Sequence, residues 1–276
     1  MKNIFISLTL FLLIMFSSCT NYRYINSASP PNNPYFTKKG DSKITAYFST
    51  AADLRPAKKY AYGFDLQGGY AIGNHLALTA GYFNRIEKDA YSGSYNIYDS
   101  SIVRYRRNLF DIGAGYFISL NSNKTITANF YGGVGKGKFI FNDSGLDKNQ
   151  LAYHRYHESD ITKWYIQPSV NFIPLDYFRL SFATKVSFVH YGKIQTSYTA
   201  DELEFFSLNK IANKTLTFFE PSLDFQIGVP RLSWVNLDVV FSATSNYHSD
   251  GSHLNVRGSN FSVGLNFDLS KINKKN

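Results

Sequence analysis

The stretch FRLSFATKVSFVHY, residues 178–191, decides the fold class of this chain. Its even positions are apolar as far as Phe188, apart from Thr184, while most of its odd positions are Arg, Ser or Lys. Alternation with a period of two predicts a β-strand with two different faces. The stretches FEPSLDFQIGV (219–229) and NFSVGLNFDL (260–269) repeat the pattern. One face of the sheet therefore suits hydrocarbon, and the other suits water or a polar lumen.

Ten segments with this alternation follow one another along the chain. Their connections alternate between turns of a few residues and loops of 9 to 23 residues. An even number of strands, with short turns on one side and longer loops on the other, predicts an all-β, transmembrane, antiparallel up-and-down β-barrel. Ten strands are expected, with eight or twelve as the alternatives. The predicted strands are residues 43–49, 59–72, 75–86, 102–120, 124–140, 161–173, 177–191, 215–229, 235–246 and 258–269.

A soluble β-sandwich or lipocalin-like barrel would have the opposite polarity, with its apolar face inward. Alternation alone does not distinguish the two. The bulk of the apolar face favours lipid, and so do aromatic rings near the predicted strand ends, which resemble the interfacial girdles of membrane barrels. These rings are Tyr62, Trp164, Tyr177, Tyr191 and Trp234.

The composition excludes several other classes of protein. The 276 residues include 24 Phe, 21 Tyr and 2 Trp, which is too many rings for a disordered chain. One Cys builds neither a disulfide framework nor a Cys-based zinc site. The longest apolar run, residues 4–16, is shorter than the roughly 18 residues of a helical span. The formal net charge is +9. Many of the basic residues are predicted to lie on the short-turn rim, which indicates contact with anionic lipid headgroups. No nucleic-acid partner is expected.

The N-terminus predicts the compartment. Residues 1–18 have the layout of a secretory signal peptide, with Lys2 before an apolar core. The following Phe16-Ser17-Ser18-Cys19 resembles a bacterial lipobox, which implies cleavage after Ser18 and acylation of Cys19. The chain is therefore expected to be an outer-membrane lipoprotein.

The remaining boundaries follow from the change in pattern. Residues 19–42 contain three prolines and no apolar periodicity, so they are expected to form an extended periplasmic tether. Residues 43–270 form the predicted barrel, and residues 271–276 form a basic periplasmic tail. Both chain ends would then be periplasmic, with the lipid anchor in the inner leaflet of the outer membrane.

Four short motifs carry a resemblance to a known group of proteins. They are PYFTKKG (34–40), FDLQGGY (64–70), YIQP (165–168) and FEPS (219–222). The chain resembles a group of uncharacterised outer-membrane β-barrel lipoproteins of the Gram-negative envelope, over nearly its whole length. The group has no established activity, so the resemblance implies a fold and a location and carries over no catalytic residue.

The predicted lumen face carries both signs of charge. A barrel of about eight strands is filled by its own side chains, and ten strands are expected to be largely filled as well. Because buried charges need partners, the sequence predicts an interior charge network, with Lys185 and Asp224 as one candidate pair. A selective small pore is the alternative. The network residues are Arg85, Arg107, Lys163, Arg179, Lys185, Asp65, Asp111, Glu220, Asp224 and Asp238.

The predicted external loops hold weak candidates for a metal site. His154, His157, His248 and His253 could converge on one rim, and imidazoles with carboxylates are plausible ligands for a divalent metal. Solvated loop histidines are the commoner case, so no metal and no cofactor are expected. Ten-stranded barrel proteases would require paired Asp residues and an Asp/His couple at the outer rim. This chain offers His248 and Asp250 but no second carboxylate pair at matching spacing, and no catalysis is expected.

These features favour a non-catalytic outer-membrane lipoprotein with a structural or interaction role. It could act as an accessory subunit of a larger envelope assembly, with outer-membrane lipids and an envelope protein as partners. A narrow small-solute channel or a loop-mediated surface binder is the alternative. An outer-membrane hydrolase or lipid-modifying enzyme is the remote alternative.

Overall fold

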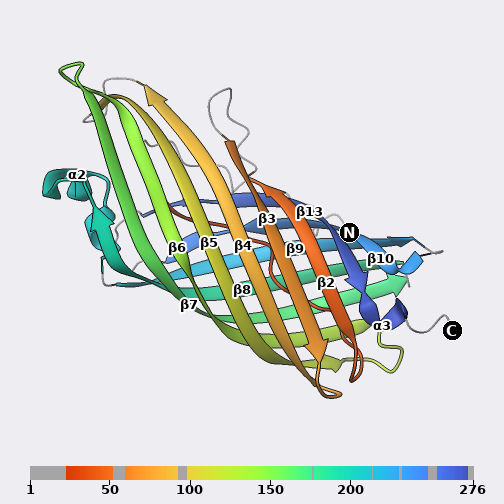
Figure 1. Cartoon of the computed structure of the whole chain (residues 1–276). Coiled ribbons are helices and arrows are strands. Elements are labelled where there is room, and N and C mark those ends of the chain that lie inside the picture. Colours follow the sequence, from red (N-terminus) through yellow and green to blue (C-terminus); the bar gives the residue numbers. More distant parts are fainter. Residues whose placement is uncertain are drawn as a thin grey trace, which may run out of the picture.

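Ten antiparallel strands form one closed barrel in a computed structural model of the chain (Figure 1). The structure describes residues 23–272 except 52–59, 93–97, 176, 213, 230–231 and 248–253. Each strand pairs with its neighbour in the chain, and the pairings of β10 with β9 and of β13 with β2 close the ring. The barrel strands are β2 (Ser42–Thr50), β3 (Tyr60–Ala71), β4 (Leu76–Ser92), β5 (Tyr98–Ser119), β6 (Ile126–Asp147), β7 (Ala152–Leu175), β8 (Phe178–Thr196), β9 (Thr215–Val229), β10 (Leu232–Ala243) and β13 (Ser259–Asp268).

The predicted fold class and the predicted number of strands are confirmed. Strands β4 to β8 are longer than predicted, however, and take in most of the stretches expected to be loops at 87–101 and 141–160 and the first five residues of the stretch 192–214. The sheet continues there without an apolar outer face, because its outward residues meet water instead of lipid. Alternation of apolar and polar side chains, the signal on which the prediction depended, is weak in such a segment.

The polarity of the wall is that of a membrane barrel. Outward side chains such as Phe48, Phe110 and Phe130 are 61%, 55% and 54% exposed, whereas inward side chains such as Asp65 and Gln167 are buried. Only lipid suits a barrel with an apolar exterior and a polar interior. The protein is therefore a transmembrane β-barrel of the outer-membrane type.

The apolar belt covers only one part of the wall. On β7 the outward residues are apolar from Trp164 to Phe172, a length of nine residues that matches a tilted membrane crossing. Beyond Trp164, towards Ala152, the outward residues include Thr162, Asp160 and Glu158. The half of β7 on that side therefore extends past the membrane. The prediction that Tyr191 belongs to an interfacial girdle is wrong, because its side chain points into the barrel and is 1% exposed.

The two ends of the barrel differ. At the short-turn end β2 begins at Ser42 and β3 ends at Ala71, and at the long-loop end β4 ends at Ser92 and β7 begins at Ala152. Smaller elements follow the strands at each end, and no described helix is long and apolar enough to cross a bilayer. These elements are β1 (Tyr24–Ser27), α2 (Ala200–Phe205), the 3-10 helix η1 (Leu208–Lys210), β11 (Ser245–Tyr247), β12 (Asn255–Arg257) and α3 (Leu269–Ile272).

Residues 23–41, the lumenal segment, run through the inside of the barrel from one end to the other. Near the short-turn end Gly40 donates its backbone N–H to Ala71. Near the long-loop end β1 pairs in parallel with β12, and Arg23 is buried beside residues of β5 and β6. Nineteen extended residues reach about 60 Å, which matches the height of 24-residue strands tilted by about 40°.

This path overturns the expectation of a periplasmic tether. The lumenal segment is a buried filling of the barrel and not a periplasmic tether, because its side chains find polar partners on the lumen wall. The two ends of the described chain also lie at opposite ends of the barrel. Arg23 is at the long-loop end and α3 is at the short-turn end, and the predicted first residue of the mature chain, Cys19, lies outside the described residues.

Candidate functional site: the occupied lumen

The lumenal segment is held most firmly at the long-loop end. The Arg23 guanidinium forms an ion pair with Asp143 of β6 and donates a hydrogen bond of 3.1 Å to Ser101 of β5. Both members of the pair are at most 1% exposed. Tyr198 donates to the same carboxylate at 2.7 Å, and the ring of Phe206 lies 4.0 Å from the guanidinium carbon. A buried charge with this many partners is a fixed anchor.

Glu87 of β4 is a second anchor, shared by the wall, the segment and β12. Its Oε2 lies 2.5 Å from Arg107 Nη1 and 3.3 Å from Arg257 Nε. Ser27 of the lumenal segment donates its hydroxyl to Oε1 and accepts a hydrogen bond of 2.8 Å from Arg107. Arg257 also pairs with Asp89 at 2.7 Å. With Arg23 and Asp143 included, three buried guanidiniums meet three buried carboxylates near this end of the lumen.

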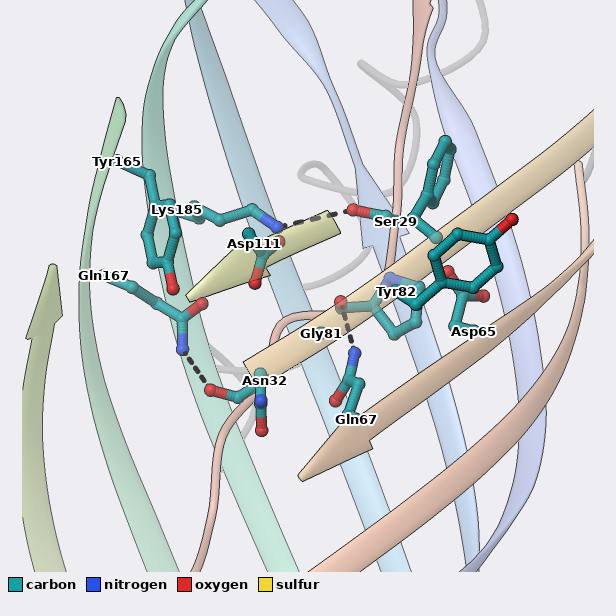
Figure 2. Close-up of a pocket in the computed structure, with 12 residues that line it drawn as sticks. Ser29, Asn32, Asp65, Gln67, Gly81, Tyr82, Asp111, Tyr165, Gln167 and Lys185 are labelled. Carbon is teal, nitrogen blue, oxygen red and sulfur yellow. Dashed lines mark hydrogen bonds between the residues drawn. The ribbon is translucent and has the colours of Figure 1, made fainter. Parts of the chain in front are cut away.

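The middle of the segment is held by hydrogen bonds to the wall (Figure 2). Lys185 of β8 donates to the Ser29 hydroxyl at 3.3 Å, and Gln167 of β7 donates to the Asn32 carbonyl at 2.9 Å. Gln67 donates to the Pro30 carbonyl. Beside them lies a cavity of about 20 Å³, lined in part by Asp111. That volume is room for about one water molecule and not for an organic ligand.

Near the short-turn end the segment is fixed by one asparagine and one aromatic ring. Asn33 accepts hydrogen bonds at 2.7 Å from Ser169 and at 3.0 Å from Asn129, and it donates to Asn171 at 2.8 Å. Lys43 donates to the Asn33 carbonyl at 3.1 Å. The ring of Phe36 packs in a small apolar cluster formed with Ala71, Ala77, Phe117 and Tyr131. The described lumen is thus occupied along its whole length.

The ten predicted network residues all lie on lumen-facing positions of the wall. Arg85 pairs with Asp65 at 2.9 Å, while Lys163 and Lys185 lie 3.6 Å and 3.9 Å from Glu220. The suggested pair of Lys185 with Asp224 is wrong, because the register places Glu220 opposite Lys185 and Ser181 opposite Asp224.

The remaining network residues lie nearer the short-turn end. Arg179 donates to Gln226 at 2.9 Å, and Asp238 accepts from Tyr47 at 3.1 Å. Asp224 is buried and one of its oxygens has no hydrogen-bond partner. These groups bind the strands and the segment together, and two cavities beside the segment measure about 20 Å³ and about 30 Å³.

The predicted convergence of histidines is not found where the structure describes it. His154 and His157 lie on opposite faces of β7, with His154 exposed and His157 buried. The His157 ring stacks on Phe141 with 5.0 Å between ring centres. His248 and His253 lie outside the described residues. Among the described residues, no three His, Cys, Asp or Glu side chains lie close enough together to hold a metal ion.

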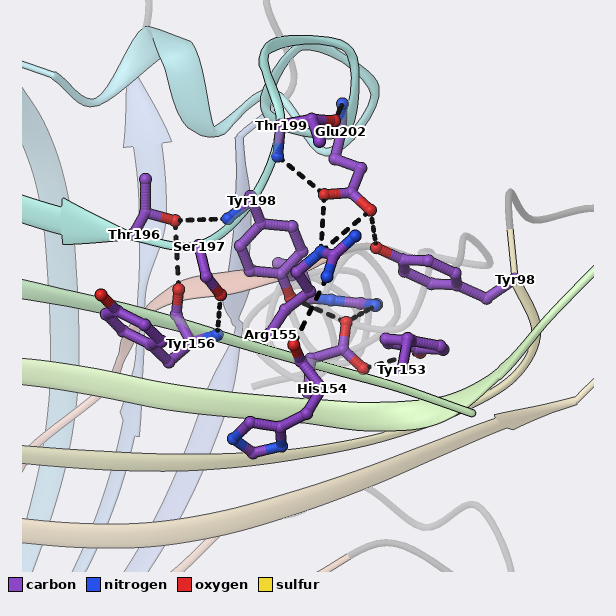
Figure 3. Close-up of polar contacts among 12 residues, drawn as sticks. Tyr98, Tyr153, His154, Arg155, Tyr156, Thr196, Ser197, Tyr198, Thr199 and Glu202 are labelled. Atoms are coloured by element: carbon purple, nitrogen blue, oxygen red, sulfur yellow. Dashed lines mark hydrogen bonds and ion pairs between the residues drawn. The ribbon is translucent and has the colours of Figure 1, made fainter. Parts of the chain in front are cut away.

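Helix α2 closes over the long-loop end through Glu202 (Figure 3). Thr199 and Glu202 form a reciprocal capping box, and Glu202 also accepts from Arg155 at 2.9 Å and from Tyr98 at 2.5 Å. Burial raises the pKa of Glu202, but hydrogen bonds from Arg155, Tyr98 and Thr199 outweigh it and hold that pKa below its ordinary range. The charged form of Glu202 therefore stabilises the docked helix.

Several residues that hold the lumenal segment have no counterpart in the sequence-based predictions. They are Arg23, Ser27, Asn33, Phe36, Glu87, Asp89, Asp143 and Arg257. Glu87 and Asp89 could have been found by extending the period of two beyond residue 86, since they continue the inward positions of β4. Cys19, the predicted lipidation site, lies outside the described residues.

No family model and no curated protein matches this chain. Among solved structures, the chain is similar to the translocator domain of the autotransporter NalP from Neisseria meningitidis, with 10% identity, a TM-score of 0.47 and coverage of 84% of this chain and 89% of that one. It is similar to the outer membrane protease OmpT from Escherichia coli, with 10% identity, a TM-score of 0.40 and coverage of 84% and 94%. It is also similar to Ail, the attachment invasion locus protein of Yersinia pestis, with 11% identity, a TM-score of 0.31 and coverage of 83% and 98%. At these scores the likenesses carry no argument about activity, and the assignment as an outer-membrane barrel rests on the strand pairing and the polarity of the wall.

Proposed function

We propose that this protein is a non-catalytic outer-membrane lipoprotein with a structural or interaction role, whose barrel is closed by its own N-terminal segment. The observation that carries the proposal is the buried path of residues 23–41 through the whole lumen. A tube filled in this way, with buried ion pairs at Asp143 and Glu87, offers no route for a solute. In this proposal the barrel holds its long-loop end in a fixed position, where a partner can bind it.

The same path changes the expected place of the lipid anchor. Cys19 is four residues from Arg23, and four residues span at most about 14 Å. An acyl group on Cys19 would therefore be attached near the long-loop end. In the orientation usual for barrels with short periplasmic turns, that end is external. The proposal thus moves the acylated residue from the periplasmic side to the external side of the barrel.

An interaction role is supported by apolar side chains beyond the membrane belt. Leu151 at the β6–β7 turn, Phe205 of α2 and Tyr247 of β11 are 64%, 44% and 74% exposed. These side chains give a partner apolar surface at three separate places on the barrel. The partner in this proposal is an envelope protein that binds the long-loop end.

Site-directed labelling tests the orientation and the anchor together. Asn149→Cys places a thiol in the exposed β6–β7 turn, and Ser122→Cys places one in the exposed short turn between β5 and β6. On intact cells, a membrane-impermeant maleimide is expected to label the first variant and not the second. The mass of the mature N-terminus is expected to show acylated Cys19, and Cys19→Ser is expected to remove the acyl mass. Labelling of Ser122→Cys alone would overturn the proposed orientation.

The native size of the protein tests the interaction role. Extraction of the endogenous protein in mild detergent is expected to yield a discrete complex larger than one barrel and its micelle. Identification of the co-migrating proteins would name the partner. A lone barrel in its micelle would contradict a stable complex and leave the membrane-structural role.

A further inference from the structure

A row of positive charge crosses the outer wall of β4, β5 and β6 on the long-loop side of the apolar belt. These three strands are side by side in the wall (Figure 1). Lys88 and Arg104 are directly opposite each other in the register of β4 and β5. Lys136 is opposite Phe110, an outward belt residue that is 55% exposed. We call this row the basic patch. Its residues are Lys88, Arg104, Arg106, Lys136 and Lys138.

The five cations form one continuous surface. Neighbours two apart on a strand, and neighbours opposite or diagonal across strands, lie within about 8 Å on the same face. Arg104, Arg106, Lys136 and Lys138 are exposed, and Lys88 is half-buried. The inward neighbours Glu87 and Asp89 are buried on the other face of β4.

Little negative charge on the wall balances the basic patch. Lys138 pairs with Glu158 of β7 at 2.8 Å, and Asp160 of β7 is directly opposite Lys138 in the register. The other four cations have no carboxylate within ion-pair distance among the described residues. From Asn84, Asn108 and Lys136 towards the loops, Asp99 near the start of β5 is the one exposed Asp or Glu among the described residues of these three strands. Like charges placed directly opposite each other destabilise a sheet, so an external anion would relieve this arrangement.

The position of the basic patch indicates which anion it meets. It begins directly at the edge of the apolar belt, at Lys136 beside Phe110. Each step of two residues along a tilted strand rises by about 5 Å, so Arg104 lies within about 15 Å of that edge. Lys136 is therefore at the depth of ordinary lipid headgroups, whereas Arg106 and Arg104 are about 10 Å and 15 Å from the edge, at a depth that only a bulky headgroup reaches. Basic residues at this depth bind anionic lipid headgroups.

We propose that the basic patch binds the phosphate groups of the phosphorylated glycolipid that forms the outer leaflet, lipopolysaccharide. This inference rests on the proposed orientation, in which the long-loop end is external. Phosphates on the glycolipid neutralise the unpaired cations, and its acyl chains pack on the belt around Phe110 and Tyr82. Arg104 and Arg106 supply the planar guanidiniums best suited to phosphate.

The test uses the full-length protein in mild nonionic detergent and measures the shift in melting temperature with added glycolipid. The probes are purified lipopolysaccharide, the same material with its phosphates removed, and zwitterionic phosphatidylethanolamine. Arg104→Glu/Arg106→Glu/Lys136→Glu is expected to weaken the apparent affinity for lipopolysaccharide by about tenfold or more. Arg106→Glu is expected to weaken it less. Lys124→Glu, the same charge reversal in the short turn at the other end, is expected to leave it unchanged.

Binding at the basic patch must depend both on its cations and on the phosphates of the glycolipid. Equal binding by the wild type and the triple variant would overturn the proposal, and so would equal binding of phosphorylated and dephosphorylated glycolipid. Preferential binding of a soluble sulfated polysaccharide to the patch would overturn the lipid assignment. Because a micelle has no inside or outside, this assay does not depend on orientation, which the maleimide labelling tests independently. All substituted side chains are on the exterior, and heat-modifiable gel migration verifies that each variant folds.

Discussion

Removal of the Glu87 carboxylate is the perturbation whose consequence follows most directly from the structure. Glu87 is 1% exposed, and it contacts Arg107, Arg257 and Ser27 at once. In Glu87→Gln the side chain keeps its size but loses its charge. Arg257 retains Asp89 at 2.7 Å, whereas Arg107 retains no carboxylate partner among the described residues. One buried guanidinium is therefore left uncompensated.

The expected loss of stability is that of a broken buried ion pair, about 3–5 kcal/mol. For a chain of this size, each kcal/mol lowers the melting temperature by about 2–4 °C, so Glu87→Gln is expected to melt about 6–20 °C below the wild type. The assay is thermal unfolding of the purified barrel in detergent, followed by heat-modifiable gel migration. Scan rate is held constant, because barrels of this kind often unfold irreversibly.

An exposed ion pair provides the matched control. Glu158→Gln removes the carboxylate that pairs with Lys138, and the side chains of Glu158 and Lys138 are 34% and 52% exposed. A surface pair contributes about 0.2–1 kcal/mol, so this variant is expected to melt within a few degrees of the wild type. Equal effects of Glu87→Gln and Glu158→Gln would refute the reasoning, because they would mean that the Glu87 pair is not buried.

Three further predictions concern other parts of the molecule. The pKa of Glu202 is held below its ordinary value of about 4.3. The stabilisation of docked α2 is therefore present above that pH and is lost as the pH falls through the folded-state pKa. Hydrogen exchange of residues 199–206 at pH 6 and pH 3 measures this loss, and Glu202→Gln is expected to abolish the pH dependence. Gly133→Ala places a Cβ 2.4 Å from the Ile112 carbonyl and 2.6 Å from the Tyr165 ring, so a destabilisation of about 1–3 kcal/mol is expected. In the neighbouring Gly132→Ala the Cβ meets nothing closer than 3.4 Å. This control variant is expected to melt at the same temperature as the wild type. The wild-type protein in planar bilayers is expected to show no conductance above leak, since residues 23–41 fill the lumen; stable unitary steps would favour the channel alternative.

Much of the barrel could be predicted from the sequence because its wall must satisfy two solvents. Wherever the wall meets lipid, as from Trp164 to Phe172, each outward residue is apolar and each inward residue is polar or buried. The period of two is then unmistakable. Beyond the belt, β7 continues to Ala152 with mostly polar residues on the outer face. Backbone hydrogen bonds hold this part of the strand in the sheet, and they produce no alternation of apolar and polar side chains that a sequence could show.

The lumenal segment could not be predicted in this way. Its residues around Ser29 and Asn33 are polar, because the lumen that they fill is polar too. A segment buried by hydrogen bonds in a polar interior has the same composition as a solvated linker. The proposed network residues were accessible to prediction because strand alternation assigns them to the lumen face, but their partners depend on register. The contact of Lys185 with Glu220 instead of Asp224 is an example.

The most direct test of the central claim is whether residue 33 lies inside the barrel beside β7. In the full chain, Asn33→Cys is combined with Ser169→Cys, because the Asn33 Oδ1 and Ser169 Oγ atoms are 2.7 Å apart. The comparison pair is Asn33→Cys with Ser101→Cys, since Ser101 lies beside Arg23 at the other end of the segment. The oxidising periplasm is expected to form the first disulfide and not the second, as measured by the mass of the linked peptides. Absence of the 33–169 disulfide in a folded barrel, or equal formation of both, would contradict a lumen filled by the chain's own N-terminal segment.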